Sequence, residues 1–195
     1  NHILRTQGYV RLLAELVRDH PRFTELRAER AIDLVSRSAP LHDIGKVGIP
    51  DAILQKPGPL TAQEWQIMRT HAELGAKAIE QAERDAIEPV DFLSLAKTIA
   101  HWHHERWEGS GYPDGLSGEA IPIPARLMAL ADVFDALISP RVYKRALAYP
   151  QARAIIADGH GRHFDPDLVD VFLAHFEDFV AIAEKRSFLQ AAQVL

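Results

Sequence analysis

The chain has 195 residues, 47% of them hydrophobic, so it can bury one sizeable core but is too short for two full domains. It has no cysteine, which excludes disulfides and thiolate metal sites and leaves His, Asp and Glu as the metal ligands to consider. The net charge of −5 argues against a surface for polymeric nucleic acid, because such surfaces need an excess of Lys and Arg.

No apolar run approaches the ~20 residues that a membrane-spanning helix needs, and no segment has the pattern of a signal peptide. Together with the missing cysteines, this predicts a cytoplasmic domain without membrane insertion. Helical spacing begins with the first residues, so we expect residues 1–195 to form a single domain that starts inside an element of a longer protein.

In the first half of the chain, the apolar spacing predicts an amphipathic helix over residues 2–20 and a second over residues 24–44. A turn follows at residues 56–59. Thr61 and Glu64 have the spacing of a capping box, so a third helix is expected to start at Thr61. The apolar residues of this third helix recur at three- and four-residue intervals and are expected to face the core: Trp65, Met68, Ala72, Gly75 and Ile79.

The second half predicts a helix over residues 90–106, then a loop at residues 107–115, whose glycines and proline cannot sustain a helix. Further helices are expected over residues 125–139, 150–157 and 166–185, the last capped by Asp165, and the tail could add one more. No alternating strand pattern of useful length occurs, so the expected fold is all-α.

Three residues near the end of the second predicted helix carry the first chemical signal. Adjacent residues on a helix point about 100° apart, so His42 and Asp43 could both reach one metal ion between helices, although such pairs are more often surface or capping groups. Lys46 lies four residues after His42, where it could contact a phosphate on the metal. Its alternative role is a solvated lysine favoured by a helix C-terminus.

Histidines and acids farther along the chain add to this signal. His71 lies beside the predicted core face, and taken alone it is more often a packed or surface group. His103 and His104 point in different directions and could flank one ion or approach two, whereas His101 is expected to pack or face solvent. Asp132 stands among apolar residues, where an unpaired carboxylate is costly, and Asp135 could orient a ligand histidine by accepting its N–H.

These motifs resemble the HD-GYP family, a branch of the HD phosphohydrolase superfamily that hydrolyses the bacterial second messenger cyclic di-GMP. The resemblance rests on His42-Asp43-Ile44-Gly45-Lys46, His103-His104-Glu105 and Gly111-Tyr112-Pro113, and it runs through nearly the whole chain. It implies an HD-type helical bundle with a Gly-Tyr-Pro loop and C-terminal helices. It also implies two divalent transition-metal ions, Fe or Mn, and leaves a third open because its Glu ligand would precede Asn1.

Carried over position by position, the family's metal ligands fall on His2, His42, Asp43, His71, His103, His104 and Asp132. Asp43 would bridge the two ions, and Asp43 and Lys46 would be the catalytic residues. The substrate contacts fall on Lys46, Tyr112, Arg141 and Lys144, with Tyr112 as a packed part of a rigid turn as the alternative. Where relatives have Arg-Pro-Tyr, this chain has Arg141-Val142-Tyr143 after Pro140, so the turn there is expected to differ.

The resemblance implies that a metal-bridged hydroxide opens cyclic di-GMP to linear pGpG, with further cleavage to GMP left open. Three alternatives remain: an HD phosphohydrolase for another cyclic or linear nucleotide, a non-catalytic cyclic di-GMP receptor, and a helical scaffold whose histidines merely pack. Cyclic di-GMP and an upstream receiver or sensor domain are the expected partners, and a signalling protein and a homodimer are left open.

Overall fold

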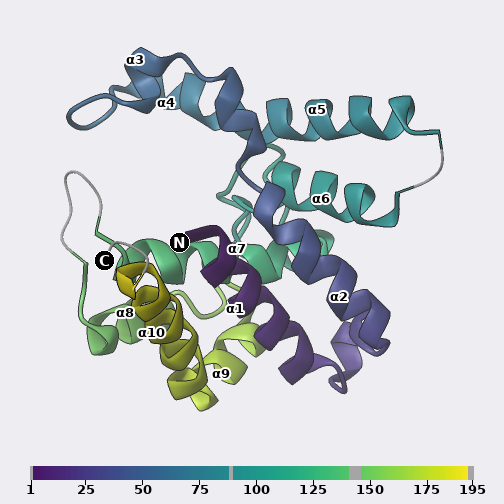
Figure 1. The fold of residues 1–195 in the computed structure, drawn as a ribbon, viewed down its shortest axis with the longest axis vertical. Coiled ribbons are helices and arrows are strands. Elements are labelled where there is room, and N and C mark those ends of the chain that lie inside the picture. The colour runs from purple at the N-terminus through teal and green to yellow at the C-terminus, as the bar shows by residue number, and fades with distance from the viewer. Residues whose placement is uncertain (1, 88–89, 141–145, 193–195) are drawn as a thin grey trace.

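The structure is a computed structural model that describes residues 2–87, 90–140 and 146–192, with side chains described as far as Lys185. Helices form the whole framework, and this part of the chain contains no β-strand (Figure 1). The all-α prediction is therefore confirmed. Two of the predicted substrate contacts, Arg141 and Lys144, lie outside the described residues.

The described chain forms ten α-helices and four short 3₁₀ helices. The α-helices are α1 (His2–Val17), α2 (Glu29–Ser38), α3 (Asp51–Leu54), α4 (Ala62–Arg69), α5 (His71–Asp85), α6 (Asp91–Trp102), α7 (Ile123–Ile138), α8 (Tyr149–Asp158), α9 (Pro166–Ala174) and α10 (Phe176–Ala192). The 3₁₀ helices are η1 (Pro21–Leu26), η2 (Ala39–Leu41), η3 (Ile44–Gly48) and η4 (Gly118–Ala120).

Helix α7 is the central element, and most of its residues are buried. Its Phe134 lies at the centre of an aromatic cluster, with ring centroids 5.2 Å from Tyr9 of α1, 5.1 Å from Phe172 of α9 and 6.3 Å from Phe179 of α10. Large buried side chains contribute most to stability, so this cluster fixes α1 against α7. It thereby sets the position of His2 relative to Asp132.

Helices α5 and α6 lie side by side as an antiparallel pair (Figure 1). Small residues at their interface allow close packing: Ala96 and Ala100 of α6 are fully buried, and a Cβ on Gly75 of α5 would lie 3.5 Å from Cβ of Ala100. The antiparallel arrangement brings the first residue of α5, His71, next to the residues that follow α6, His103 and His104. This pair therefore supplies a group of three imidazoles from two segments of sequence.

The prediction of one helix over residues 24–44 is wrong. The segment divides into parts of η1, α2 and η2, and His42 and Asp43 form the turn between η2 and η3. Pro40 accounts for the break, because proline cannot donate the backbone hydrogen bond that a continued α-helix needs. The 100° argument for His42 and Asp43 therefore does not apply, although both side chains reach the same site.

The capping box at Thr61 is confirmed, with Glu64 N 3.2 Å from Thr61 Oγ1 and Thr61 N 2.7 Å from Glu64 Oε2. The single helix predicted from there is wrong, because the chain breaks at Thr70 between α4 and α5. Helix α4, which precedes this break, buries none of its residues, so Trp65 and Met68 do not face the core.

Other boundaries also differ. Helix α6 ends at Trp102, so His103 and His104 lie on a turn and not on the predicted helix. The helix predicted over residues 166–185 divides into α9 and α10 at His175, whose φ of −114° and ψ of 25° are not helical. The predictions for residues 125–139 and 150–157 agree with α7 and α8.

Among residues 2–87, 90–140 and 146–192, none of the helices combines the length and the apolar character that a bilayer span requires.

Candidate metal centre

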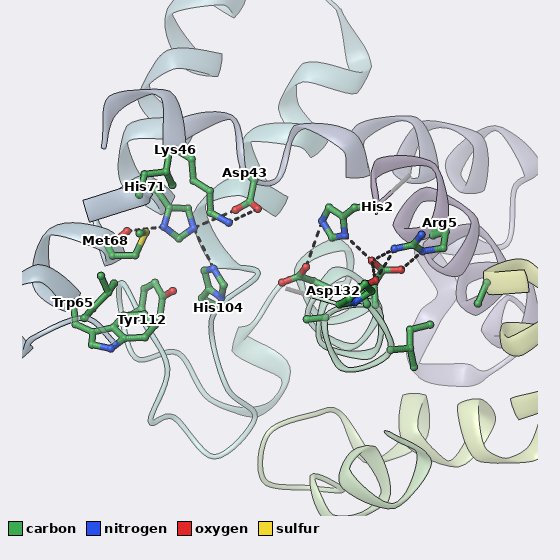
Figure 2. A pocket seen from close by; sticks show the side chains of 18 of the residues that line it. His2, Arg5, Asp43, Lys46, Trp65, Met68, His71, His104, Tyr112 and Asp132 are labelled. Atoms are coloured by element: carbon green, nitrogen blue, oxygen red, sulfur yellow. Dashed lines mark hydrogen bonds and ion pairs between the residues drawn. The ribbon is translucent and has the colours of Figure 1, made fainter. Parts of the chain in front are cut away.

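The side chains predicted as metal ligands gather at one place, in two adjacent groups. The first group consists of Asp43, His71, His103 and His104, and the second of His2, His42 and Asp132. Within each group the ligand atoms all lie within 4.8 Å of one another. Figure 2 shows His71 and His104 on one side, His2 and Asp132 on the other, and Asp43 between them.

Asp43 faces both groups. Its Oδ2 lies 3.3 Å from Nε2 of His42, while its Oδ1 lies 3.5 Å from Nε2 of His71 and 4.0 Å from Nε2 of His103. The two oxygens of one carboxylate thus point toward different sets of imidazoles. This is the geometry that a carboxylate needs to bridge two cations.

The other ligand atoms are spaced like atoms around a cation. Nε2 of His2 lies 3.4 Å from Nε2 of His42 and 3.7 Å from Oδ1 of Asp132, and Nε2 of His104 lies 3.1 Å from Nε2 of His71. Ligands at about 2.1 Å from a metal ion in tetrahedral or octahedral coordination are about 3–3.5 Å apart. Only small movements would therefore be needed to close either group around an ion.

Backbone carbonyls orient three of the imidazoles. Nδ1 lies 2.9 Å from the Ala39 carbonyl in His42, 2.7 Å from the Met68 carbonyl in His71 and 2.9 Å from the Ile99 carbonyl in His103. A carbonyl only accepts, so each Nδ1 carries the proton and donates it. Each Nε2 is left with a lone pair directed at the site, as a metal ligand requires.

The carboxylate of Asp135 orients the imidazole of His2 in the same way. Its fully buried carboxylate accepts from Nδ1 of His2 at 2.8 Å and from Arg5 at 2.6 Å and 2.9 Å, and Ser139 donates to it at 3.2 Å. Burial alone would raise the pKa of Asp135, but the hydrogen bonds from His2 and Arg5 lower it below the usual value. Asp135 therefore orients His2 as an ionised acceptor, in the role predicted for it.

Replacing Asp135 with alanine is expected to weaken metal binding about 10–100-fold, because His2 loses the acceptor that fixes its tautomer. Competition titration with a chromogenic chelator measures the affinity. Asp170→Ala is the matched control, since that carboxylate is exposed and, among the described residues, pairs only with His160. Equal metal affinity in both variants would contradict the assigned role of Asp135.

Two buried atoms of the first group have no hydrogen-bond partner among the described residues: Oδ1 of Asp43 and Nε2 of His103. Leaving such atoms unsatisfied costs free energy, so most buried polar atoms in proteins have a partner. Both atoms point at the position between the imidazoles. Mixed imidazole and carboxylate donors suit divalent transition metals, so the residues present fit such an ion.

The protonation states agree with cation binding. Burial and neighbouring charges lower the pKa of His103 to about 3, and burial lowers the pKa of His71 and His104 as well, so these imidazoles are neutral near pH 7. Burial alone would raise the pKa of Asp43, but its pairing with His42 and the charge of Lys46 hold it well below its usual range, and the same pairing raises the pKa of His42 although burial opposes this. A cation at this position would replace the proton that Asp43 favours on His42, and would leave neutral imidazoles around an ionised carboxylate.

A cavity of about 790 Å³ covers both groups and includes Lys46 and Tyr112 in its lining. The Lys46 ammonium lies 2.5 Å from Oδ2 of Asp43. The ring of Tyr112 stacks on His104 with centroids 4.7 Å apart, and the Arg69 guanidinium lies 5.1 Å from the Tyr112 ring. Tyr112 therefore both packs against a candidate ligand and faces the cavity, and burial raises its pKa so that the phenol stays protonated.

The loop that carries Tyr112 depends on Glu105, which the sequence analysis did not single out. Glu105 is 2% exposed, and its Oε1 accepts from the backbone N–H of Asp114 at 2.8 Å and of Gly115 at 3.0 Å. Gly111 allows the loop to close, because a Cβ there would lie 2.4 Å from the backbone nitrogen of Arg106. The only sequence signal for Glu105 is its place directly after His104.

Glu105→Ala is expected to lower the free energy of unfolding by about 1–3 kcal/mol, because two backbone N–H groups lose their hydrogen bonds to this buried carboxylate. Glu105→Gln keeps an acceptor oxygen of the same reach and should unfold close to the wild type in urea. If glutamine destabilises the protein as much as alanine, the carboxylate charge and not the pair of hydrogen bonds holds the loop.

His101, which we did not expect to be a ligand, lies in neither group; its Nε2 is 3.1 Å from Oδ2 of Asp114. Arg5 is a further residue that the sequence analysis missed. It lies three residues after His2 on α1, a spacing that places both side chains on the same helical face.

The sequence matches the HD domain family over residues 2–168. A protein of Vibrio cholerae named cyclic di-GMP phosphodiesterase is 56% identical over 182 residues, which are 93% of this chain and 37% of that protein. Another from the same organism, named 3'3'-cGAMP-specific phosphodiesterase 2, is 47% identical over 155 residues, which are 80% of this chain and 28% of that protein. The chain thus spans well under half of these relatives.

The solved structure of an HDGYP protein from Bdellovibrio bacteriovorus has the same fold, with a TM-score of 0.62 at 19% identity. The alignment covers 90% of this chain and 52% of that one. The chain belongs to the HD domain family, and its resemblance to the HD-GYP branch is confirmed.

Proposed function

We propose that this domain is a metal-dependent phosphodiesterase that hydrolyses cyclic di-GMP to linear pGpG, with further cleavage to GMP left open. The observation that carries the proposal is the position of Asp43, with one oxygen toward each group of ligands at the base of the cavity. The name of the relative at 56% identity supports the choice of substrate.

In this proposal each of the two groups of side chains described above binds one metal ion. His2, His42 and Asp132 hold one ion, His71, His103 and His104 hold the other, and Asp43 contributes to both. Bound divalent ions would supply charge neutralisation for the phosphodiester and lower the pKa of the attacking water. Iron or manganese is the expected metal, because mixed imidazole and carboxylate sites accept both.

The remaining polar residues bind and orient the phosphates. The Lys46 ammonium lies beside Asp43, where it can offset the charge of a phosphate at the metal centre. The Tyr112 phenol keeps its proton and can donate to a phosphate oxygen. Arg141 and Lys144, which lie outside the described residues, are proposed as cations for the second phosphate.

The setting of the domain is also part of the proposal. We propose that residues 1–195 form one domain of a longer cytoplasmic protein, with a receiver or sensor domain upstream. The absence of cysteine and the small part of each relative that the chain covers support this setting.

A second candidate is hydrolysis of another cyclic dinucleotide. The relative named as specific for 3'3'-cGAMP favours it, because this relative is 47% identical. A non-catalytic receptor is less favoured, because all seven side chains of the carried-over ligand set are present and gather in two groups that could hold an ion.

The test is a substrate panel with purified protein loaded with iron or manganese. Cyclic di-GMP and 3'3'-cGAMP are incubated separately, and the products are resolved by liquid chromatography. We expect pGpG from cyclic di-GMP, loss of activity with a chelator and recovery on adding metal back. Faster turnover of 3'3'-cGAMP would favour the second candidate, and turnover of neither would overturn both.

A further inference from the structure

The α3–α4 arm, residues 51–69, projects from the rest of the molecule (Figure 1). Helix α4 buries no residue, and its largest apolar side chain, Trp65, is 48% exposed. An amphipathic helix in a globular domain ordinarily turns its apolar side to a core. The apolar residues of this arm therefore need another explanation.

Four apolar side chains of this segment form one wall of the cavity over the metal centre: Leu54, Leu60, Trp65 and Met68. Figure 2 shows Trp65 and Met68 on the same side of the cavity as Tyr112 and His104. Charged and imidazole groups surround the position for phosphate, so the cavity has a polar floor and an apolar wall. A ligand that fits both must carry phosphate and also a flat apolar surface.

Trp65 is the aromatic ring on this side that is free to receive such a surface. Tyr112 already contacts His104 and Arg69 through its ring. The Trp65 indole makes no ring-stacking or cation–π contact with any residue that the structure describes. Tyr149 also lines the cavity, but from α8, the first helix after the end of α7.

We propose that Trp65, backed by Leu54, Leu60 and Met68, forms a subsite that stacks on one purine base of the cyclic dinucleotide while the phosphate occupies the metal centre. The inference rests on the proposed function, since it assigns a contact within the same site. Base–aromatic stacking tolerates any base, because every base has a π-face. This subsite therefore favours any nucleobase over a ligand without one. Other contacts must distinguish guanine from adenine.

The first experiment compares steady-state kinetics of metal-loaded variants with cyclic di-GMP. Trp65→Ala is expected to raise KM about 5- to 150-fold with a smaller change in kcat, because the lost stacking is made by the bound substrate. Trp65→Phe keeps an aromatic face and should recover most of the affinity. Ile67→Ala is the matched control, because Ile67 lies on the same helix, is 41% exposed and is absent from the cavity lining.

The second experiment is a direct binding signal. Rapid mixing of cyclic di-GMP with the metal-loaded protein should quench tryptophan fluorescence before turnover, because a base stacks on the indole. Trp65→Phe should lose this quench. Trp102→Phe should keep it, because the Trp102 indole donates to Asp114 and does not line the cavity.

The experiments distinguish an error in the proposed function from an error in the proposed base subsite. If the wild type hydrolyses no cyclic dinucleotide, the proposed function is wrong. If the wild type is active but Trp65→Ala leaves KM within twofold and the quench survives in Trp65→Phe, the base subsite is wrong. A fall in kcat with lower thermal stability and unchanged KM would also overturn it, since Trp65 would then act only in packing.

Discussion

Asp43→Ala should abolish hydrolysis and empty both metal positions at once. One of its oxygens lies toward each ligand group, so its loss removes a ligand from each. Metal catalysis contributes several kcal/mol of transition-state stabilisation, so turnover should fall about 1,000-fold or more. Elemental analysis of the purified variant, beside its turnover of cyclic di-GMP, measures both effects.

An isosteric substitution of Asp43 distinguishes the effect of its negative charge from the effect of its packing. Asp43→Asn keeps the size of the side chain but lacks the negative charge, so it should lose metal and activity as alanine does. Asp85→Ala is the control, because this exposed carboxylate accepts only from Gln81 in the described structure and lies outside the site. Two bound ions with full activity in Asp43→Asn would rule out a bridging carboxylate.

Gly45→Ala should move Asp43 away from His71 through the backbone. A Cβ at this position would lie 1.9 Å from the His71 carbonyl oxygen and 2.4 Å from the Gly75 nitrogen, so η3 and α5 would have to move apart. Such overpacking costs about 3 kcal/mol of unfolding free energy, which lowers Tm by about 6–12 °C in a domain of this size. Because Asp43 lies on one side and His71 on the other, metal affinity should fall with it.

Gly48→Ala is the matched control in the same 3₁₀ helix. Its added Cβ would lie 3.0 Å from a terminal methyl of Leu74, an exposed side chain that can rotate away. Differential scanning calorimetry should therefore show a small change for Gly48→Ala and a large one for Gly45→Ala. Similar Tm values for the two variants would mean that the close approach at Gly45 is not needed.

Much of the site could be predicted because its ligands lie in short motifs that can be read without a fold. His42-Asp43 and His103-His104 are such pairs, and the family resemblance linked them to His2, His71 and Asp132, which are unremarkable alone. The structure brings these positions into two groups. The helical fold was also predictable, because apolar periodicity persists through nearly the whole chain.

The breaks in the helices were not predictable from periodicity, because the apolar spacing continues across Thr70 although the chain changes direction there. The wrong core assignment of Trp65 follows from that break. Arg5 and Glu105 were missed for another reason. Their roles consist of contacts with Asp135 and with the backbone of Asp114, and such contacts exist only after distant segments have folded together.

The two ligand groups draw on α1, the turn at His42, the α5–α6 pair and α7, segments that span residues 2–132. Cations held there would act as cross-links between the parts of the bundle. Ligand binding to the native state alone raises stability by about 2.7 kcal/mol at a free concentration one hundred times Kd. The supply of metal would thus affect the stability of the folded domain, and loss of metal would lower that stability as well as prevent the reaction.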